Sequence, residues 1–456
     1  KKNTHKTHQS GGSRERAMRS AARRLMSSSH SALRSLCPGW SHLTPTVVQR
    51  GQGCRVWDAS TSSSAAILDF TCGIGVTNTG HCHPRVVAAI QQQASQLLFG
   101  QVNCMVTQPA LELAHQLQRV VPAHLHAFFF SNSGAEAVEA SVKVARAATG
   151  KPNIIAMEGG FHGRTYLGMA LTASKTVYRA GFSPLPGGIF FAPFPNHYRY
   201  GWSEEQAVQF ALRELEQILH TQTAPTETAA VIMEPILGEG GYVPAPDAYL
   251  QGVRKICDDN NILLIMDEIQ SGFGRAGDWW AHSQSGVDAD ILIMAKGLAS
   301  GMPMSCVASR PELMSNLPVG SMGGTYGGGN AVVMAAAVAT IQAIEEEGML
   351  ENSRNMGKYL VQRLKNLQAK YPAIGDVRGR GLMIGTEFSV PWSNQPDSTG
   401  MKSVHQYCLS KNLWLLTCGS GGNVIRWIPP LIVTQQDLDE ALGIFEDGLA
   451  HTYGKP

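Results

Sequence analysis

Two short apolar runs, each followed by a charged residue, constrain the fold of this chain most. Residues 262–266 read Ile-Leu-Leu-Ile-Met and are followed by Asp267, while residues 291–295 read Ile-Leu-Ile-Met-Ala and are followed by Lys296. Continuous apolar runs of this length, rich in Ile and Leu and bounded by Gly, are typical of strands buried on both faces of a parallel sheet. In such α/β sheets, ligands bind beyond the carboxyl ends of the strands. The pattern therefore predicts that Asp267 and Lys296 lie at one edge of a sheet.

A carboxylate and an amine at one sheet edge suit chemistry between a carbonyl and an amine. A Lys that follows five apolar residues is poorly solvated, which disfavours its ammonium form. The neutral amine is the nucleophile that forms a Schiff base with an aldehyde. Pyridoxal phosphate requires such a Lys, and an acid beside its ring nitrogen. On spacing alone, an ion pair between two strand ends, or a Lys that extends to water, fits Asp267 and Lys296 as well.

The segments around these two residues resemble a known family. They read Met-Asp-Glu-Ile-Gln-Ser-Gly-Phe-Gly-Arg over residues 266–275, Ala-Lys-Gly over 295–297 and Gly-Met-Pro-Met-Ser over 301–305. This is similar to the class III aminotransferases, which are fold-type-I pyridoxal-phosphate enzymes. The resemblance runs from about Pro45 to the last helix. It implies an α/β fold with a large, doubly wound, mostly parallel sheet domain and a small α/β domain.

Composition excludes several other classes of protein. The 456 residues are 43% hydrophobic and 16% charged, with a net charge of +2, so a large core is possible and no acidic or basic partner is implied. We expect no nucleic-acid partner and no membrane span, because no apolar run reaches the roughly 18 residues that a spanning helix needs. The 9 Cys are scattered without a CxxC pair, which favours reduced thiols over a disulfide framework or a zinc site.

The first part of the chain has the composition of a targeting leader. Arg residues stand among Ser and Ala from Met18 to Arg34, and no Asp or Glu occurs between Glu15 and Asp58. Arg- and Ser-rich, acid-poor segments are typical of organelle transit peptides. We expect import into mitochondria, with plastids as the alternative, and a disordered leader over residues 1–44. A basic tail without a targeting role is the other interpretation.

A phosphate site is predicted where a strand turns into a helix. The strand spans residues 127–130, and Ser131, Asn132 or Ser133 could cap a helix that begins at Gly134. A helix N-terminus offers unpaired N–H groups and a partial positive charge, which suit a phosphate. The resemblance implies that Ser133, Gly134 and Ala135 bind the phosphate of the cofactor. An ordinary capping turn is the alternative.

The resemblance also assigns the groups around the cofactor ring. Phe161 would lie over one face of the pyridine ring and Ile269 on the other, because an aromatic side chain at a strand end can stack on a ring ligand. Asp267 would keep the ring nitrogen protonated, Gln270 would bond the phenolic oxygen, and Lys296 would hold the cofactor and transfer the proton.

Substrate carboxylates are expected to meet two arginines. Arg164 follows a Gly-rich turn, and a guanidinium binds a carboxylate in a two-pronged fork. In the 4-aminobutyrate and acetylornithine branches of the family, the position of Arg164 binds a substrate carboxylate, and in the family the loop around Ile74 covers the entrance. A surface Arg after a Gly turn is the alternative for Arg164. Glu239 would pair with Arg426 and release it when a 2-oxo acid binds. A structural salt bridge between Glu239 and Arg426 is the alternative.

A Gly-rich segment over residues 323–330 is expected at a subunit interface. In relatives the Thr at the position of Thr325 reaches the phosphate of the neighbouring subunit, which implies a homodimer with shared sites. This chain has three Gly before Asn330, and Ala331 where Pro is common, so the local backbone departs from the family pattern. His81 and His83 have no third ligand nearby in the sequence, so we expect structural roles for both and no metal site.

These patterns together predict domains and a reaction. Residues 45–100 would join the small domain, residues 101–348 would form the large cofactor domain, and residues 349–456 would complete the small domain. The reaction expected is ping-pong transamination from an ω-amino acid, best represented by 4-aminobutyrate, to a 2-oxo acid such as 2-oxoglutarate. Acetylornithine or ornithine aminotransferases and decarboxylating dialkylglycine-type enzymes are the alternatives, together with a cofactor-binding scaffold that lacks turnover.

Overall fold

The computed structural model describes residues 35–59 and 66–455. These residues divide into two compact units, one with residues 35–50, 57–59 and 66 and the other with residues 51–56 and 67–455. The predicted leader therefore lies outside the described residues up to position 34. In the first unit β1 (Val48–Gln52) begins, and the guanidinium of Arg50 lies 3.9 Å above the ring of Trp57. The domain boundaries expected within the longer unit remain a prediction.

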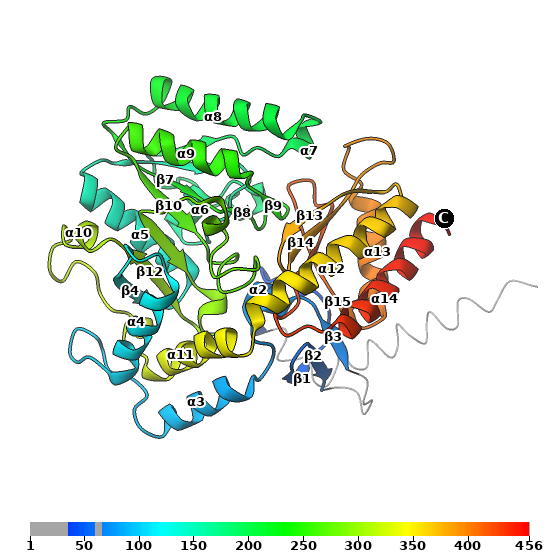
Figure 1. Cartoon of the computed structure of the whole chain (residues 1–456), viewed down its shortest axis with the longest axis horizontal. Coiled ribbons are helices and arrows are strands. Elements are labelled where there is room, and N and C mark those ends of the chain that lie inside the picture. The colour runs from blue at the N-terminus through cyan, green and yellow to red at the C-terminus, as the bar shows by residue number, and fades with distance from the viewer. Residues whose placement is uncertain (1–34, 60–65, 456) are drawn as a thin grey trace, which may run out of the picture. The chain divides into compact units, whose positions relative to one another are not determined.

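A seven-stranded sheet forms the centre of the second unit (Figure 1). Strand β12 runs antiparallel to β11 and β4, while β11, β10, β7, β5 and β6 pair in parallel. This confirms the predicted large, mostly parallel sheet. Its strands, in spatial order, are β4 (Ala127–Ser131), β12 (Ser305–Ser309), β11 (Ile291–Met294), β10 (Leu263–Asp267), β7 (Thr228–Met233), β5 (Asn153–Met157) and β6 (Ile189–Ala192).

Alternate residues of the central strands pack into two separate hydrophobic cores. In β10, Leu264 and Met266 belong to one core, whereas Leu263 and Ile265 belong to the other. The first core includes side chains of α9 (Asp247–Asp259), and the second includes side chains of α5 (Gly134–Thr149). Both faces of the sheet are therefore buried, which explains why these strands read as continuous apolar runs rather than alternating ones.

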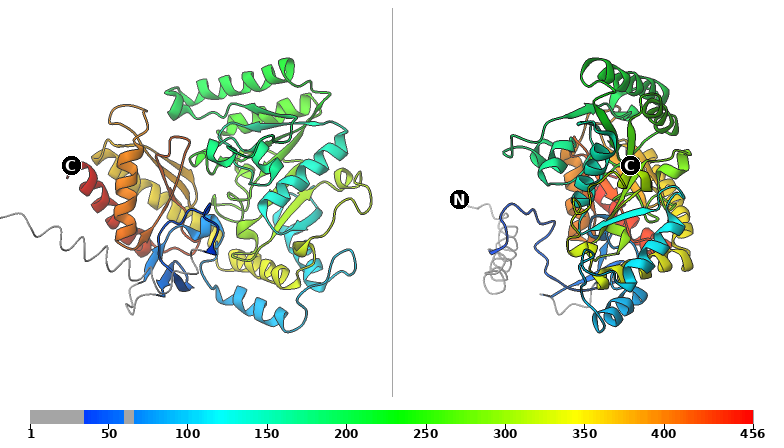
Figure 2. Two further views of the ribbon diagram at one scale, coloured as in Figure 1. Left: turned by 180° about the vertical axis from the view of Figure 1, so that it is seen from behind. Right: turned by 90° about the vertical axis from the view of Figure 1, so that its left-hand side faces the viewer.

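A second, antiparallel sheet lies later in the chain and has the order β13-β14-β17-β16. Figure 2 (left) shows it with its helices, apart from the seven-stranded sheet. In the N-terminal part of this unit, β3 (Ile67–Asp69) pairs in parallel with β15 (Leu413–Trp414). Strand β2 (Arg55–Asp58) pairs with β3 through Arg55 and Val56. The strands of the antiparallel sheet are β13 (Ile374–Arg380), β14 (Met383–Phe388), β16 (Leu416–Cys418) and β17 (Val424–Trp427).

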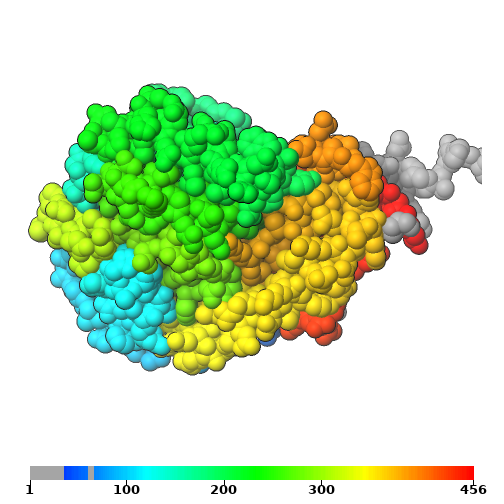
Figure 3. Space-filling view, turned by 45° about the horizontal axis from the view of Figure 1, so that its top comes forward, coloured from blue at the N-terminus to red at the C-terminus, as the bar shows by residue number. Residues whose placement is uncertain are grey.

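Helices cover these sheets and connect them. Figure 3 shows α11 and α12 as a yellow band. The band runs from the region of the seven-stranded sheet toward the region of the sheet β13-β14-β17-β16. No helix among the described residues is both long and apolar enough to cross a membrane. The remaining helices are α2 (Cys72–Gly75), α3 (Pro84–Ala94), α4 (Gln108–Val120), α6 (Tyr166–Leu171), α7 (His197–Tyr200), α8 (Glu204–Thr221), α10 (Pro311–Met314), α11 (Ala331–Glu346), α12 (Met349–Lys370), α13 (Ser398–Ser410) and α14 (Gln435–Tyr453).

Two expectations about secondary structure were wrong. Residues 178–200 are rich in Pro, Gly and aromatic residues, which predicts a loop, but they contain the edge strand β6, whose short Phe-rich run is stabilised by pairing with β5. Pro84 suits a first helical turn and predicts a helix over about residues 84–98, but the helix ends at Ala94, because the chain turns at Ser95, whose hydroxyl donates to the carbonyl of Gln92. Both differences arise where a turn or a tertiary pairing overrides the local pattern.

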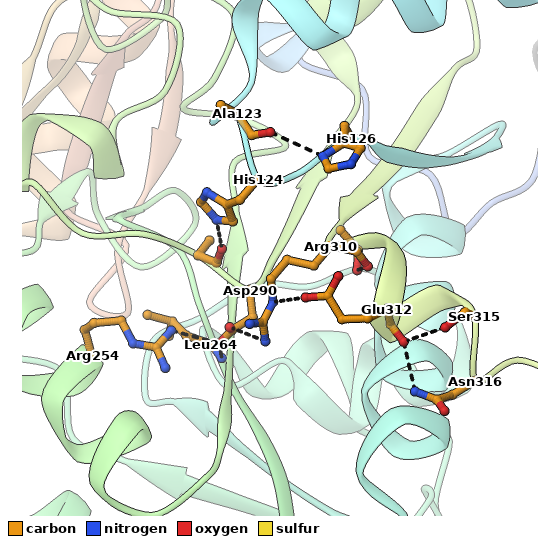
Figure 4. Close-up of polar contacts among 12 residues, drawn as sticks. Ala123, His124, His126, Arg254, Leu264, Asp290, Arg310, Glu312, Ser315 and Asn316 are labelled. Atoms are coloured by element: carbon orange, nitrogen blue, oxygen red, sulfur yellow. Dashed lines mark hydrogen bonds and ion pairs between the residues drawn. The ribbon is translucent and has the colours of Figure 1, made fainter.

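The amino ends of β10 and β11 are joined by a polar network (Figure 4). The Asp290 carboxylate accepts a hydrogen bond from the backbone N–H of Leu264 at 2.8 Å. It also pairs with the Arg254 guanidinium at 2.8 Å and the Arg310 guanidinium at 3.0 Å. The charge of Asp290 is therefore neutralised by two guanidiniums at this end of the sheet.

Candidate active site

A cavity of about 610 Å³ opens at the carboxyl ends of the central strands. It lies where ligands bind in open α/β sheets. The structure brings every residue predicted for the site into its lining except Thr325 and Arg426. These lining residues are Ile74, Ser133, Gly134, Ala135, Phe161, Arg164, Glu239, Asp267, Ile269, Gln270 and Lys296.

Lys296 and Asp267 enter this cavity from neighbouring strands. Asp267 pairs in register with Ile293, and Lys296 follows three residues later, so both side chains reach the same edge. The backbone of Lys296 has φ 45°, a left-handed conformation that side chains rarely adopt and that is often found at functional sites. Burial lowers the pKa of Lys296 to about 8, although the nearby carboxylates of Glu234 and Glu239 oppose this change. A large fraction of the amine is therefore neutral near pH 8 and able to act as a nucleophile.

The Asp267 carboxylate is held by a histidine that sequence reasoning missed. His162 Nδ1 lies 2.7 Å from one Asp267 oxygen, and the backbone N–H of Ile269 donates to the other at 3.1 Å. Burial disfavours a charged imidazole, but the hydrogen bond and the charge of Asp267 raise the pKa of His162 above its ordinary value. These two contacts fix the position of the Asp267 carboxylate in the cavity wall. The signal was present in the Gly-Phe-His-Gly-Arg motif, but nothing local connects it to a residue 105 positions away.

The N-terminus of α5 supplies free backbone donors. Ser133 caps the helix through its side chain, and Glu136 returns to the backbone N–H groups of Asn132 and Ser133 in a capping box. Within the described part of the chain, no hydrogen bond engages the N–H groups of Gly134 and Ala135. Two donors at a positive helix end therefore face the cavity, which is the arrangement that binds phosphate.

Arg164 presents a guanidinium that has no acidic partner among the described residues. Its guanidinium carbon lies 4.9 Å from the centre of the Tyr178 ring and 5.9 Å from the centre of the Phe161 ring. Aromatic faces stabilise a cation without neutralising it. The charge thus remains available to an anion that enters the cavity.

The second predicted guanidinium is already paired. Arg426 donates to Glu239 at 2.6 Å and to the backbone carbonyl of Thr417 at 2.7 Å, from a position behind the cavity lining. The other Glu239 oxygen accepts a hydrogen bond from Tyr178 at 3.0 Å. Burial opposes the charge of Glu239, but Arg426, Lys175 and Tyr178 together lower its pKa below the ordinary value. The geometry contains the predicted pair and adds Tyr178 to it.

Ile74 lines the mouth of the cavity in an unusual backbone conformation. Cys72, Gly73, Ile74 and Gly75 all have positive φ, with 50° at Cys72 and 66° at Ile74. A β-branched residue in this region is an outlier that the surrounding structure must enforce. Arg275 contributes to that enforcement, since its buried guanidinium contacts the Cys72 sulfur and the Asn78 side chain.

Thr325 lies outside the cavity lining of this chain. Its hydroxyl accepts a hydrogen bond from the Asn132 amide at 2.6 Å, and Asn132 itself lines the cavity. The unusual glycines have a packing role, because a side chain at Gly327 would meet the Ser131 carbonyl and one at Gly329 would meet the Gly100 carbonyl. The reach of Thr325 to a partner subunit remains a prediction.

The two histidines considered for a metal have carboxylate partners instead. His81 pairs with Asp69 at 2.7 Å, and His83 pairs with Glu347 at 3.1 Å. Over residues 35–59 and 66–455, no group of three or more potential ligands is arranged to hold a metal ion.

The donor set of the cavity fits pyridoxal phosphate. Lys296 supplies an amine of lowered pKa for the aldehyde, Asp267 supplies an anion for the ring nitrogen, and α5 supplies N–H groups for the phosphate. Gln270 adds a buried side-chain oxygen that has no partner among the described residues. One cavity therefore contains a group for each polar end of the cofactor.

Comparisons with known proteins agree with this chemistry. Residues 37–449 match the class-III aminotransferase family. The 5-aminovalerate aminotransferase of Pseudomonas putida is 38% identical over 413 residues, which cover 90% of this chain and 95% of that protein. The 4-aminobutyrate aminotransferase of Escherichia coli is 37% identical over 408 residues, which cover 89% of this chain and 94% of that protein.

Solved structures show the same fold. A PLP-bound amine transaminase from an uncultivated Pseudomonas species has a TM-score of 0.84 at 26% identity, covering 91% of this chain and 98% of that one. The ornithine aminotransferase of Toxoplasma gondii has a TM-score of 0.81 at 26% identity, covering 95% and 97%. With the cavity chemistry and the family match taken together, this chain belongs to the class III aminotransferases, which depend on pyridoxal phosphate.

Proposed function

We propose that this aminotransferase moves an amino group from an ω-amino acid, with 4-aminobutyrate as the leading donor, to 2-oxoglutarate. One observation carries the proposal: the two guanidiniums near the cavity are in different states. Arg164 lines the cavity without an acidic partner, whereas Arg426 is paired with Glu239 at 2.6 Å. An ω-amino acid brings one carboxylate and 2-oxoglutarate brings two, so an enzyme for both needs one guanidinium that is always available and a second that can be released.

The residues divide the work between the two half-reactions. In the first, Arg164 binds the distal carboxylate of the donor, while Glu239 keeps Arg426 neutralised. In the second, Arg426 leaves Glu239 and binds the α-carboxylate of the 2-oxo acid, while Arg164 binds its distal carboxylate. Bound pyridoxal phosphate supplies the electron sink that makes the substrate carbon acidic. Lys296, with its lowered pKa, accepts and returns the proton at the reacting carbon.

The relatives differ in the chain length of the donor for which they are named. Relatives named for 4-aminobutyrate and for 5-aminovalerate are similarly identical to this chain, at 37% and 38%, and these two donors differ by one methylene group. One methylene in a pocket changes specificity by about 10–200-fold. We therefore propose that 4-aminobutyrate and 5-aminovalerate are both substrates and that they differ only in kcat/KM.

Ornithine and acetylornithine remain the second candidate donors. The Phe161-His162-Gly163-Arg164-Thr165 motif also suits that branch, and the ornithine aminotransferase of Toxoplasma gondii has the same fold. A decarboxylating reaction is the third candidate and is distinguished by release of carbon dioxide.

A donor panel tests the proposal directly. The holoenzyme is mixed with 4-aminobutyrate, 5-aminovalerate, ornithine, acetylornithine or 2-aminoisobutyrate, and the absorbance change of the cofactor is followed. Each donor is then paired with 2-oxoglutarate or pyruvate, and product and carbon dioxide are measured. We expect the highest kcat/KM for an ω-amino acid with 2-oxoglutarate. A preference for acetylornithine, or stoichiometric release of carbon dioxide, would contradict the proposed donor. The absence of a spectral change with every donor would indicate a cofactor-binding scaffold without turnover.

We also propose that the enzyme is a homodimer with shared sites. Several apolar side chains are exposed along residues 97–111 and at Tyr326, and the Phe99 and Tyr326 rings lie 5.5 Å apart. Exposed apolar side chains gathered in this way mark interaction surfaces. Thr325, which is predicted to contribute to the phosphate site of the neighbouring subunit, directly precedes Tyr326. This prediction would therefore place the subunit interface at the same exposed surface.

Finally, we propose that the protein is imported into mitochondria, with plastids as the alternative. The Arg- and Ser-rich, acid-poor composition before Asp58 supports this location. A fusion of residues 1–44 to a fluorescent protein tests it. We expect organellar fluorescence, and a diffuse cytosolic signal would contradict the proposal.

A further inference from the structure

Tyr178 touches both carboxylate sites without lining the cavity itself. Its ring lies beneath the Arg164 guanidinium at 4.9 Å and edge-on to the Phe161 ring at 5.2 Å. Its hydroxyl donates to Glu239 at 3.0 Å. Tyr178 ends a short 3₁₀ turn (Thr176–Tyr178), which places it between the two guanidinium sites. No other described residue contacts both Arg164 and Glu239 in this way.

Among the residues that the structure describes, two donors bond the Glu239 carboxylate directly, one at each oxygen. Arg426 donates to one oxygen at 2.6 Å, and Tyr178 donates to the other at 3.0 Å. When Arg426 turns to a substrate carboxylate, Tyr178 remains as the direct donor to a largely buried carboxylate. A buried carboxylate without a partner is costly, and a hydrogen bond to a charged group stabilises it substantially.

The phenol is suited to this role at any physiological pH. Burial, together with the charge of Glu239, raises the pKa of Tyr178 to about 12. The hydroxyl therefore keeps its proton and continues to donate.

We propose that Tyr178 is a positioning residue for the switch between the two half-reactions: its hydroxyl holds Glu239 in place after Arg426 has left, and its ring supports Arg164 throughout. This inference rests on the proposed function, because it concerns an enzyme that binds carboxylates at both guanidiniums. The two parts of the side chain then have separable effects. Loss of the hydroxyl alone disfavours the state in which Arg426 is released, while the donor state keeps both Arg164 support and the Glu239–Arg426 pair.

The test compares the two half-reactions in Tyr178→Phe holoenzyme. We expect the KM for 2-oxoglutarate to rise about tenfold, which is the equivalent of one charged hydrogen bond of modest strength, and the KM for 4-aminobutyrate to change less than twofold. Tyr166→Phe is the matched control, because Tyr166 is exposed and its hydroxyl makes no hydrogen bond to the described residues. It should leave both KM values unchanged.

A double-mutant cycle separates positioning from a general structural effect. In the Glu239→Gln background Arg426 has no carboxylate to leave, so adding Tyr178→Phe should change the KM for 2-oxoglutarate less than twofold. Equal losses in both half-reactions, or the same tenfold effect in the Glu239→Gln background, would overturn the inference.

A binding measurement keeps the inference testable if the donor assignment fails. Glutarate has two carboxylates and no reacting carbonyl, so its dissociation constant reports on both guanidiniums without turnover. Calorimetry should show glutarate binding weakened about tenfold in Tyr178→Phe and no further weakening when this change is added to Glu239→Gln. Unchanged glutarate binding in Tyr178→Phe would overturn the role of Tyr178, whereas failure of 4-aminobutyrate to react with wild-type enzyme would overturn only the donor.

Discussion

Lys296 follows four buried strand residues and lies in a backbone conformation that side chains rarely adopt. Both features depend on the sheet around it, since an isolated peptide would leave the amine in water. The folded protein therefore carries a Lys whose charged form is disfavoured. That state suits nucleophilic chemistry, but it lowers the stability of the cofactor-free protein.

The stability effect of Lys296 has a defined pH window. Its pKa is about 8 in the folded protein and has the ordinary value of 10.5 in the unfolded chain, so the unfolded chain binds more protons between these values. Stability therefore rises with pH across this window, and the full cost of burying the charge is present below pH 8. Cofactor-free Lys296→Met should be more stable than wild type by about 1–3 kcal/mol at pH 7, with the advantage disappearing by about pH 10.5. Urea unfolding at several pH values measures this, and a pH-independent difference would contradict it.

Arg164 gives a second prediction at the scale of one residue. Lys keeps the positive charge but cannot form the two-pronged bond to a carboxylate. Arg164→Lys should lower kcat/KM for 4-aminobutyrate about 10–100-fold and should change kcat/KM for a simple amine such as butylamine by less than threefold. Steady-state kinetics with the two donors measures the difference, and equal losses would remove Arg164 from carboxylate recognition.

At the scale of elements, β10 and β11 have different tasks at their two ends. The carboxyl ends deliver Asp267 and Lys296 to the cavity, where both side chains are accessible to a ligand. The amino ends are joined by Asp290, which bonds Arg254, Arg310 and the backbone of Leu264 (Figure 4). The network joins the amino ends of the two strands, at the far end from the catalytic pair.

Asp290→Asn tests the division between the two ends. The variant keeps the size of the side chain but removes the charge between two guanidiniums, so it should lower the free energy of unfolding by about 1–3 kcal/mol. The KM values should remain within twofold, because the site lies at the other end of the strands. Asp288→Asn is the control, since Asp288 is exposed two residues earlier. A large rise in KM without loss of stability would show that the two ends are not separate.

For the whole molecule, the exposed apolar surface matters most. Leu98 and Val106 are each 62% exposed and Tyr326 is 74% exposed, although all three are large and apolar. Contact between water and these apolar side chains is unfavourable, so the exposed surface favours association with a complementary apolar surface. A second copy of the chain accounts for this surface, as proposed above.

The double variant Met105→Asp/Val106→Asp tests the dimer. Two carboxylates in an apolar interface should convert wild-type dimers to monomers at micromolar concentration, as measured by sedimentation or light scattering. Activity should fall at least tenfold, because each site would lose the predicted contribution of the partner's Thr325. Trp392→Asp is the control, because Trp392 is also highly exposed but lies away from residues 97–111 in the sequence. A wild-type chain that is monomeric at these concentrations would contradict the proposal.

Much of the scaffold was predictable from local patterns. The strands β4, β10 and β11 begin and end within one residue of their expected positions, and α5 begins at Gly134 as expected. They are long or strongly apolar elements, and their patterns carry the signal of a sheet buried on both faces. β6 was not predicted, because a four-residue edge strand between Gly and Pro residues has no pattern of its own and depends on β5 for pairing.

The sequence by itself determined that an acid and an amine would meet at one sheet edge. Each buried strand appears as an apolar run that stops at a charged residue, and the carboxyl ends of parallel strands lie at the same edge of the sheet. Only the tertiary structure decided which side chains would hold them. His162 reaches Asp267 across 105 residues, and Tyr178 reaches Glu239 across 61. Periodicity describes what a segment buries, but it says nothing about which distant segment it is buried against. That choice arises from packing many elements into one core, where the positions of all side chains are settled together.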